Sequence, residues 1–176
     1  MASLVRRKAA VKFEIGRTSG VLIMAMELFV LSDQKLKSVS EWQHAINGEG
    51  YSLRLEDGKS IESLKGFLPA RLHNTKTGFE CGCWSIAQFH GAFPDVKVNQ
   101  TWKYALTLRW GGDLRQLEAA WIAAAAYAQA TRGVIFDEQD GKIKSASEAR
   151  AAVHDIISAM PKAEPILREI KGQTPR

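Results

Sequence analysis

The stretch that decides the fold is Trp102-Lys-Tyr-Ala-Leu-Thr-Leu-Arg-Trp110, followed by Gly-Gly-Asp and an alanine-rich run. Large apolar side chains occupy every second position of this stretch, and Lys103, Thr107 and Arg109 lie between them. Successive side chains of a β-strand point to opposite faces, so this period of two predicts a strand with one buried and one polar face. If no helix covers it, the polar face is a candidate binding surface made of Lys103, Thr107 and Arg109.

The segment after this strand has the pattern of a helix packed against it. Asp113, with Gln116 three residues later, is typical of a helix N-terminus, and Gly133 marks the end. Between them, residues 119–128 are apolar on nearly all sides, which indicates burial on more than one side. A homodimer contact is the alternative interpretation of this apolar surface.

The rest of the chain alternates irregularly between strand and helix patterns. Further strands are expected at 27–31, 51–55, 79–84 and 134–136, and further helices at 39–47 and 146–157, the last closed by Pro161. Residues 60–70 fit either a short helix or a packed loop. Several connections between strands are too short for the crossover that a parallel pair needs. The sequence therefore predicts an α+β fold, with a mainly antiparallel sheet of about five strands covered by two or three helices.

Length and charge limit the class of protein. A chain of 176 residues suits one domain with a sizeable core. Of the net charge of +5, residues 1–23 carry +4, because they contain five cations and only Glu14 as an anion. We therefore expect a basic, disordered extension over 1–23, a single α+β domain over 24–161 and a C-terminal tail over 162–176. The nearly neutral domain argues against a nucleic-acid-binding surface.

Two features bear on the compartment. No run approaches the roughly 18 apolar residues of a membrane-spanning helix, so no span is expected. The two cysteines, Cys81 and Cys83, leave no second pair to build a disulfide framework, which favours the reducing cytoplasm. An organelle-targeting peptide is the alternative interpretation of residues 1–23.

Four zinc-competent side chains fall within 18 residues: His73, Cys81, Cys83 and His90. Structural zinc sites usually space their cysteines by two to four residues, whereas one residue separates this pair. Burial in the core is the competing interpretation, because free cysteine is among the most buried residue types. A small thiol- or zinc-dependent enzyme using these four residues is the alternative function. No residue is assigned a catalytic role, and no cofactor is expected.

Asp137, Glu138 and Asp140 form an acidic group behind the strand expected at 134–136. Asp140 belongs with Gly141 to a hairpin-type turn. Asp137 and Glu138 extend the candidate binding surface, because an acidic patch can neutralise a basic site on another protein.

Several segments carry a family resemblance. They are Glu27-Leu-Phe-Val-Leu-Ser32, Glu41-Trp42-Gln43, Thr77-Gly78-Phe79-Glu80, and Gly133-Val-Ile-Phe-Asp137 with Asp140-Gly141 behind it. Together they resemble the small cytosolic immunity proteins of bacterial toxin–immunity systems, over residues 26 to about 158. The resemblance implies a cytoplasmic protein-binding module that occludes or sequesters a partner protein such as a toxin domain. The lack of a convincing catalytic constellation favours binding over enzymatic activity and leaves the enzyme open as the alternative. Immunity proteins are often clearly acidic; the near-neutral domain departs from that pattern and argues against electrostatic steering.

Overall fold

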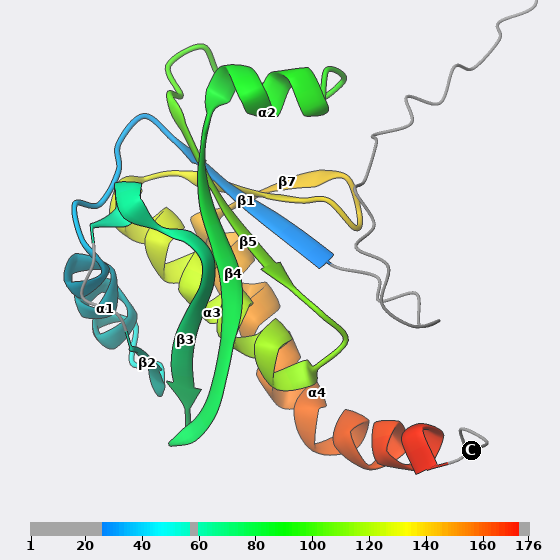
Figure 1. Cartoon of the computed structure of the whole chain (residues 1–176). Helices are drawn as coiled ribbons and strands as arrows, with labels where there is room; N and C mark the ends of the chain where they lie inside the picture. The colour runs from blue at the N-terminus through cyan, green and yellow to red at the C-terminus, as the bar shows by residue number, and fades with distance from the viewer. Residues whose placement is uncertain (1–25, 57–59, 173–176) are drawn as a thin grey trace, which may run out of the picture.

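Seven strands form one sheet, which is the central layer of the structure. The computed structural model describes residues 26–56 and 60–172 (Figure 1). The order across the sheet is β2-β3-β4-β5-β1-β6-β7, and every neighbouring pair is antiparallel. The strands are β1 (Met26–Ser32), β2 (Leu53–Leu55), β3 (Lys65–Leu72), β4 (Thr75–Ser85), β5 (Tyr104–Trp110), β6 (Val134–Asp137) and β7 (Lys142–Ser145).

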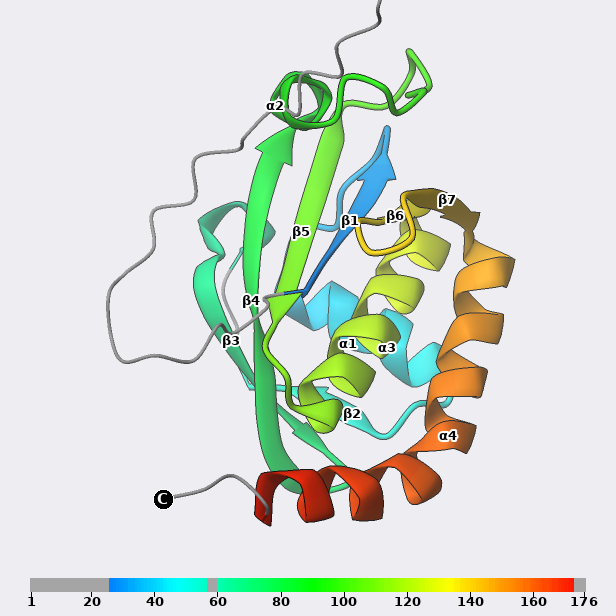
Figure 2. The same cartoon turned by 90° about the vertical axis from the view of Figure 1, so that its right-hand side faces the viewer.

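Helices lie on both faces of the sheet, but unequally. They are α1 (Val39–Gly48), the 3₁₀ turn η1 (Ile61–Ser63), α2 (Ile86–Ala92), α3 (Leu114–Thr131) and α4 (Ala146–Gly172). Figure 2 shows α1, α3 and α4 on one side of the sheet, with α2 at one end of the molecule. The α+β fold and its antiparallel sheet are confirmed. The expected counts are wrong, since the described residues form seven strands and four α-helices.

The main core lies between the sheet and α3. On β5, Leu106, Leu108 and Trp110 face this core, as the alternation predicts. Residues 119–128 of α3 are buried throughout, because the sheet, α1 and α4 all pack around this helix. The apolar sides of this run are therefore covered within one chain. A hydrogen bond also joins α1 to α3, because the Trp42 indole Nε1 donates to the Ala123 carbonyl at 2.8 Å.

The strand that sequence patterns conceal is β3. Leu68, Ala70 and Leu72 are buried at alternate positions, which is ordinary for a strand with one covered face. Pro69 interrupts the pattern because it cannot donate a hydrogen bond and is rare inside sheets. Here it pairs with Gly78 of β4, whose φ is +154°.

The last helix runs further than its sequence suggests. The expected end at Pro161 is wrong, because α4 continues through Pro161 and Pro165 to Gly172. Figures 1 and 2 show two segments of α4 that run in different directions, as proline in a helix commonly causes. No described helix is long and apolar enough to cross a membrane. The extension expected at residues 1–23 lies outside the described residues, as do residues 173–176 of the expected tail.

A second, aromatic core lies on the opposite face of the sheet. Phe29 of β1 is its centre, with ring centroids 5.2 Å from Phe89 of α2, 5.2 Å from Phe93 and 6.2 Å from Phe136. This cluster attaches α2 to the sheet near the ends of β1 and β4. Further along the same face, towards the start of β1, the side chains become polar.

Candidate functional site

A row of charged side chains crosses the polar end of this face. Cross-strand pairing places Arg109 of β5 directly between Glu27 of β1 and Glu80 of β4. Glu138, which follows β6, lies beside Glu27, since its backbone N–H donates to the Glu27 carbonyl at 3.4 Å. We call Glu138, Glu27, Arg109 and Glu80 the charged row. It joins residues that are up to 111 positions apart in the sequence.

The row holds three carboxylates and one guanidinium. Arg109 Nη2 lies 3.4 Å from Glu27 Oε2, and Arg109 Nη1 lies 3.9 Å from Glu80 Oε2. The Glu27 side chain is only 10% exposed, whereas that of Glu80 is 59% exposed. One arginine cannot neutralise three carboxylates, so the row carries a formal charge of −2 when all are ionised. This local charge is compatible with a nearly neutral domain.

The surroundings raise the pKa values of two members of the row. Burial raises the pKa of Glu27; Arg109 opposes this shift, and the charges of Glu138 and Glu80 add to it. Burial also raises the pKa of Glu138, again opposed by Arg109 and reinforced by Asp137. Both glutamates would therefore be more easily ionised beside an additional positive charge. The row is suited to receive a cation.

An exposed aromatic side chain ends the row. Phe67 of β3 pairs with Glu80 and is 59% exposed, the most exposed large apolar residue of the described chain. Its ring lies across Gly78, where an added Cβ would come within 2.4 Å of Phe67 Cζ. The glycine thus lets the ring lie flat on the sheet. Phe67 therefore places an exposed apolar ring next to the carboxylates.

The structure brings together three of the five residues expected to form the binding surface. Thr107, Arg109 and Glu138 share the face opposite α3; Thr107 is buried, and its hydroxyl donates to the Gly82 carbonyl at 3.4 Å. Lys103 lies elsewhere, just before β5, where its backbone pairs with Ser32 and Ile86.

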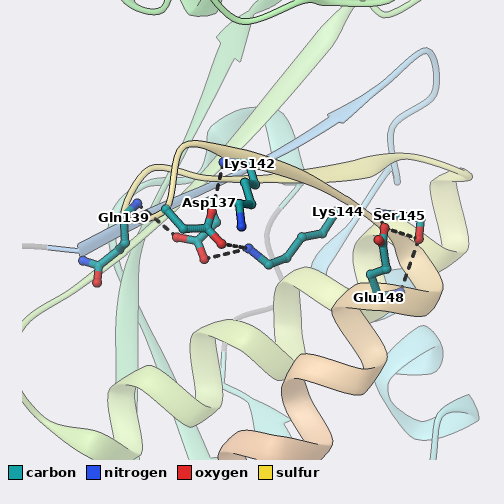
Figure 3. A network of polar contacts seen from close by, with 7 residues as sticks. Asp137, Gln139, Lys142, Lys144, Ser145 and Glu148 are labelled. Carbon is teal, nitrogen blue, oxygen red and sulfur yellow. Dashed lines mark hydrogen bonds and ion pairs between the residues drawn. The ribbon is translucent and has the colours of Figure 1, made fainter.

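Asp137 points to the other side of the sheet, towards α3. Its carboxylate accepts hydrogen bonds from Lys144 Nζ at 3.1 Å and from the backbone N–H of Gln139 at 3.1 Å (Figure 3). Lys144 also binds Asp140 at 2.6 Å and lies 5.7 Å from the Trp121 ring centroid. These contacts hold the β6–β7 hairpin against the helical layer. Asp137 therefore has a structural role here, and it does not share the face of Glu138.

The four zinc-competent residues do not converge. His73 lies in the tight turn between β3 and β4, at least six strand residues from Cys81, which is about 20 Å. His90 is exposed on α2, across the sheet from the face of the cysteines. No group of three His, Cys, Asp or Glu side chains able to hold a metal ion occurs among residues 26–56 and 60–172.

Both thiols are poor nucleophiles in this arrangement. Cys81 is buried in the main core, and burial raises its pKa strongly. Cys83 is more exposed, but burial still raises its pKa, and its thiol donates to the Ile61 carbonyl at 3.2 Å. The reactive thiolate is disfavoured at both positions.

Comparisons with known proteins add no relationship to these observations. No protein-family model, curated protein or solved structure matches the chain.

Sequence reasoning missed Glu27, Glu80 and Phe67. Glu27 belongs to a strand whose neighbours are far away in the sequence, and Phe67 to β3, which the sequence patterns conceal. The proximity of both residues to Arg109 therefore depends on the strand order. One sequence signal was available for the two glutamates. Each is a charged residue in an otherwise apolar strand pattern: Glu27 lies two positions before Phe29, and Glu80 lies between Phe79 and Cys81. Alternation assigns each glutamate to a face, but it does not say which residues lie beside it.

Proposed function

We propose that this chain is a cytoplasmic protein-binding module that occludes or sequesters a partner protein, in the way that immunity proteins bind toxins. The charged row and Phe67 would contact a basic segment of that partner. The observation that carries the proposal is the row itself: three carboxylates around one arginine, ending in an exposed phenylalanine, on a part of the sheet that no described helix covers.

Two residues of this surface, Arg109 and Phe67, support the proposal by their residue type. Aromatic residues and arginine are enriched in the centres of interfaces, where a few side chains supply most of the binding energy. Acidic side chains around them select a partner of opposite charge and speed its approach. The near-neutral domain makes this attraction local, so we expect the row to determine specificity more than long-range steering.

The face of the sheet is a better candidate than its β2 edge. A partner can extend a sheet by pairing with the free backbone groups of an edge strand. At β2 these groups are already occupied: Gln43 Nε2 donates to the Leu53 carbonyl at 2.9 Å, and the Leu55 N–H donates to Gln43 Oε1 at 2.7 Å. Gln43 thus closes this edge with its side-chain amide.

The test compares capture of a partner by matched variants. Wild-type protein is immobilised and exposed to lysate of the source cell, beside Glu80→Lys and the control Asp155→Lys, which makes the same charge change on exposed α4. A second pair is Phe67→Ala and Ile157→Ala, which truncate two exposed apolar residues on different faces. We expect Glu80→Lys and Phe67→Ala each to weaken capture about fivefold or more, and both controls to retain it.

Two results would contradict the proposal. One is the absence of any partner that is retained by wild-type protein at physiological salt. The other is equal loss of binding in the row variants and their controls, which would place the interface elsewhere. All four substitutions are at exposed positions, so circular dichroism is expected to show unchanged folding.

The thiol- or zinc-dependent enzyme is the alternative, and no geometric observation favours it. Metal analysis of protein purified without chelators tests it directly. One bound zinc per chain, lost on substitution of Cys81 or Cys83, would support that alternative over the binding module.

A further inference from the structure

A pocket of about 330 Å³ lies at the end of the sheet where β4 passes into α2, on the side that faces α3. Its walls come from separate parts of the chain: β4, the start of β5, η1 and α3. Ile61, Leu106 and the ring of Tyr104 make much of the wall apolar. Ligand sites in proteins commonly have volumes from about 300 Å³ and mostly apolar walls with few polar groups.

The size of the pocket indicates the size of its ligand. An apolar cavity of about 150 Å³ is known to bind benzene. A pocket of about 330 Å³ therefore has room for two fused rings. It is far too small for a folded partner, and it lies away from the charged row.

A buried tyrosine supplies the polar group. Tyr127 of α3 lines the pocket and is 2% exposed. Its hydroxyl oxygen accepts the Leu36 N–H at 3.2 Å, and no acceptor for its own proton is found among the described residues. Burial raises the pKa of Tyr127, so the hydroxyl keeps this proton at physiological pH. A ligand with a hydrogen-bond acceptor can accept a hydrogen bond from this hydroxyl in place of pocket water, which would favour such a ligand over one without an acceptor.

Charges at the opening disfavour a cationic ligand. Lys35 is paired with Glu62, and its ammonium lies 5.0 Å from the Tyr104 ring centroid. Lys103 also lines the pocket and adds a positive charge. A cation would meet two ammonium groups and one carboxylate there.

We propose that this pocket binds a largely apolar, non-cationic compound of about two fused rings, in which a ring nitrogen or oxygen accepts the hydrogen bond of the Tyr127 hydroxyl. This site is separate from the charged row and does not depend on the proposed protein partner.

Two probes of the same shape test the proposal. Quinoline has a ring nitrogen that accepts a hydrogen bond, and naphthalene does not. In mildly alkaline buffer, where quinoline is unprotonated, each is titrated into ¹⁵N-labelled protein and followed by the amide signals of Leu36 and Leu106. We expect saturable binding of both, with quinoline bound about fivefold more tightly. Tyr127→Phe should remove this preference while leaving naphthalene affinity unchanged.

Two substitutions at Cys83 provide a blocking variant and its control. Cys83 lines the pocket and is exposed, so Cys83→Phe can be accommodated while its ring fills the space. Binding of both probes should fall more than tenfold in Cys83→Phe and persist in Cys83→Ser. Circular dichroism and the amide spectrum report whether each variant is folded.

Three outcomes would overturn the proposal. They are no saturable binding of either probe, binding that persists unchanged in folded Cys83→Phe, and a quinoline preference that survives in Tyr127→Phe. If Tyr127→Phe does not fold, the wild-type protein is titrated with two further compounds in place of that variant. Isoquinoline has a ring nitrogen that accepts a hydrogen bond, and 1,2-dihydronaphthalene has no acceptor. The protein must then bind isoquinoline more tightly, and equal affinities would refute the hydrogen bond.

Discussion

Removing Arg109 should destabilise the protein in a way that depends on pH. In Arg109→Met the three carboxylates of the charged row lose their cation, and the Glu27 carboxylate is the most buried of them. Coulomb's law for the 3.4 Å contact gives about 5 kcal/mol at an effective dielectric of about 20 and about 1 kcal/mol in water. Because the Arg109 side chain is 36% exposed, solvent screens the pair, and we expect a loss of about 1–2 kcal/mol at neutral pH.

The sign of the pH effect follows from the raised pKa of Glu27. A carboxyl group whose folded pKa lies above its ordinary 4.5 contributes most stability below that value and loses it as pH rises through the folded pKa. Arg109 lowers the pKa of Glu27, so its removal raises that pKa further and makes the loss steeper. Below about pH 4, where Glu27 is protonated, the variant should approach wild-type stability.

Urea unfolding at neutral and acidic pH measures this difference. The control is the double variant Glu27→Gln with Arg109→Met, which leaves no buried carboxylate in the charged row. It should be more stable at neutral pH than Arg109→Met alone. A loss of stability that is the same at both pH values would refute the electrostatic reasoning. So would a double variant no more stable than the single one, since the penalty would then come from packing.

Three further predictions concern the binding face, the glycine beneath its aromatic residue and the thiols. Affinity for a basic partner should rise as pH rises through the raised pKa values of the charged row, and calorimetry in two buffers should detect proton release; an affinity independent of pH would contradict this. Gly78→Ala should cost about 1–3 kcal/mol in thermal unfolding, because its φ is +154° and its Cβ would overlap Phe67, whereas Gly91→Ala, with open space around it, should be tolerated. Ellman's reagent should label Cys83 in the native protein, more slowly than free cysteine, and Cys81 only after unfolding; equal rates would show that the core around Cys81 opens readily.

Local sequence patterns predicted the elements that have strong local signals. The alternation at 102–110 and the cap at Asp113 define β5 and α3. In the structure Asp113 Oδ1 accepts hydrogen bonds from the backbone N–H groups of Arg115 and Gln116 at 2.8 and 3.3 Å. β3 and β7 were missed for separate reasons. Pro69 interrupts the first, and the second is only four residues long, with two lysines. Packing and pairing with neighbours stabilise both strands despite weak local preference.

The candidate site was less predictable than the fold. Asp137 and Glu138 looked like one acidic group because they are adjacent in the sequence, yet alternation along the chain sends their side chains to opposite faces. Arg109 was identified from its own strand alone. Its neighbours Glu27 and Glu80 could not be identified from the sequence, because no local pattern predicts that β5 lies between β1 and β4.

The position of β1 inside the sheet, between β5 and β6, has a consequence for how the chain folds. β1 is the first described strand, but its partners are β5 and β6, which come much later in the sequence. Glu27 therefore cannot pair with Arg109, nor Leu28 with Asp137, until those residues have been synthesised. During synthesis, the apolar segment Leu28–Leu31 therefore has no strand to pair with until more than seventy further residues have been made. Such long-range pairing slows folding and leaves an aggregation-prone segment exposed in the meantime. We expect the nascent chain to depend on chaperones over this interval.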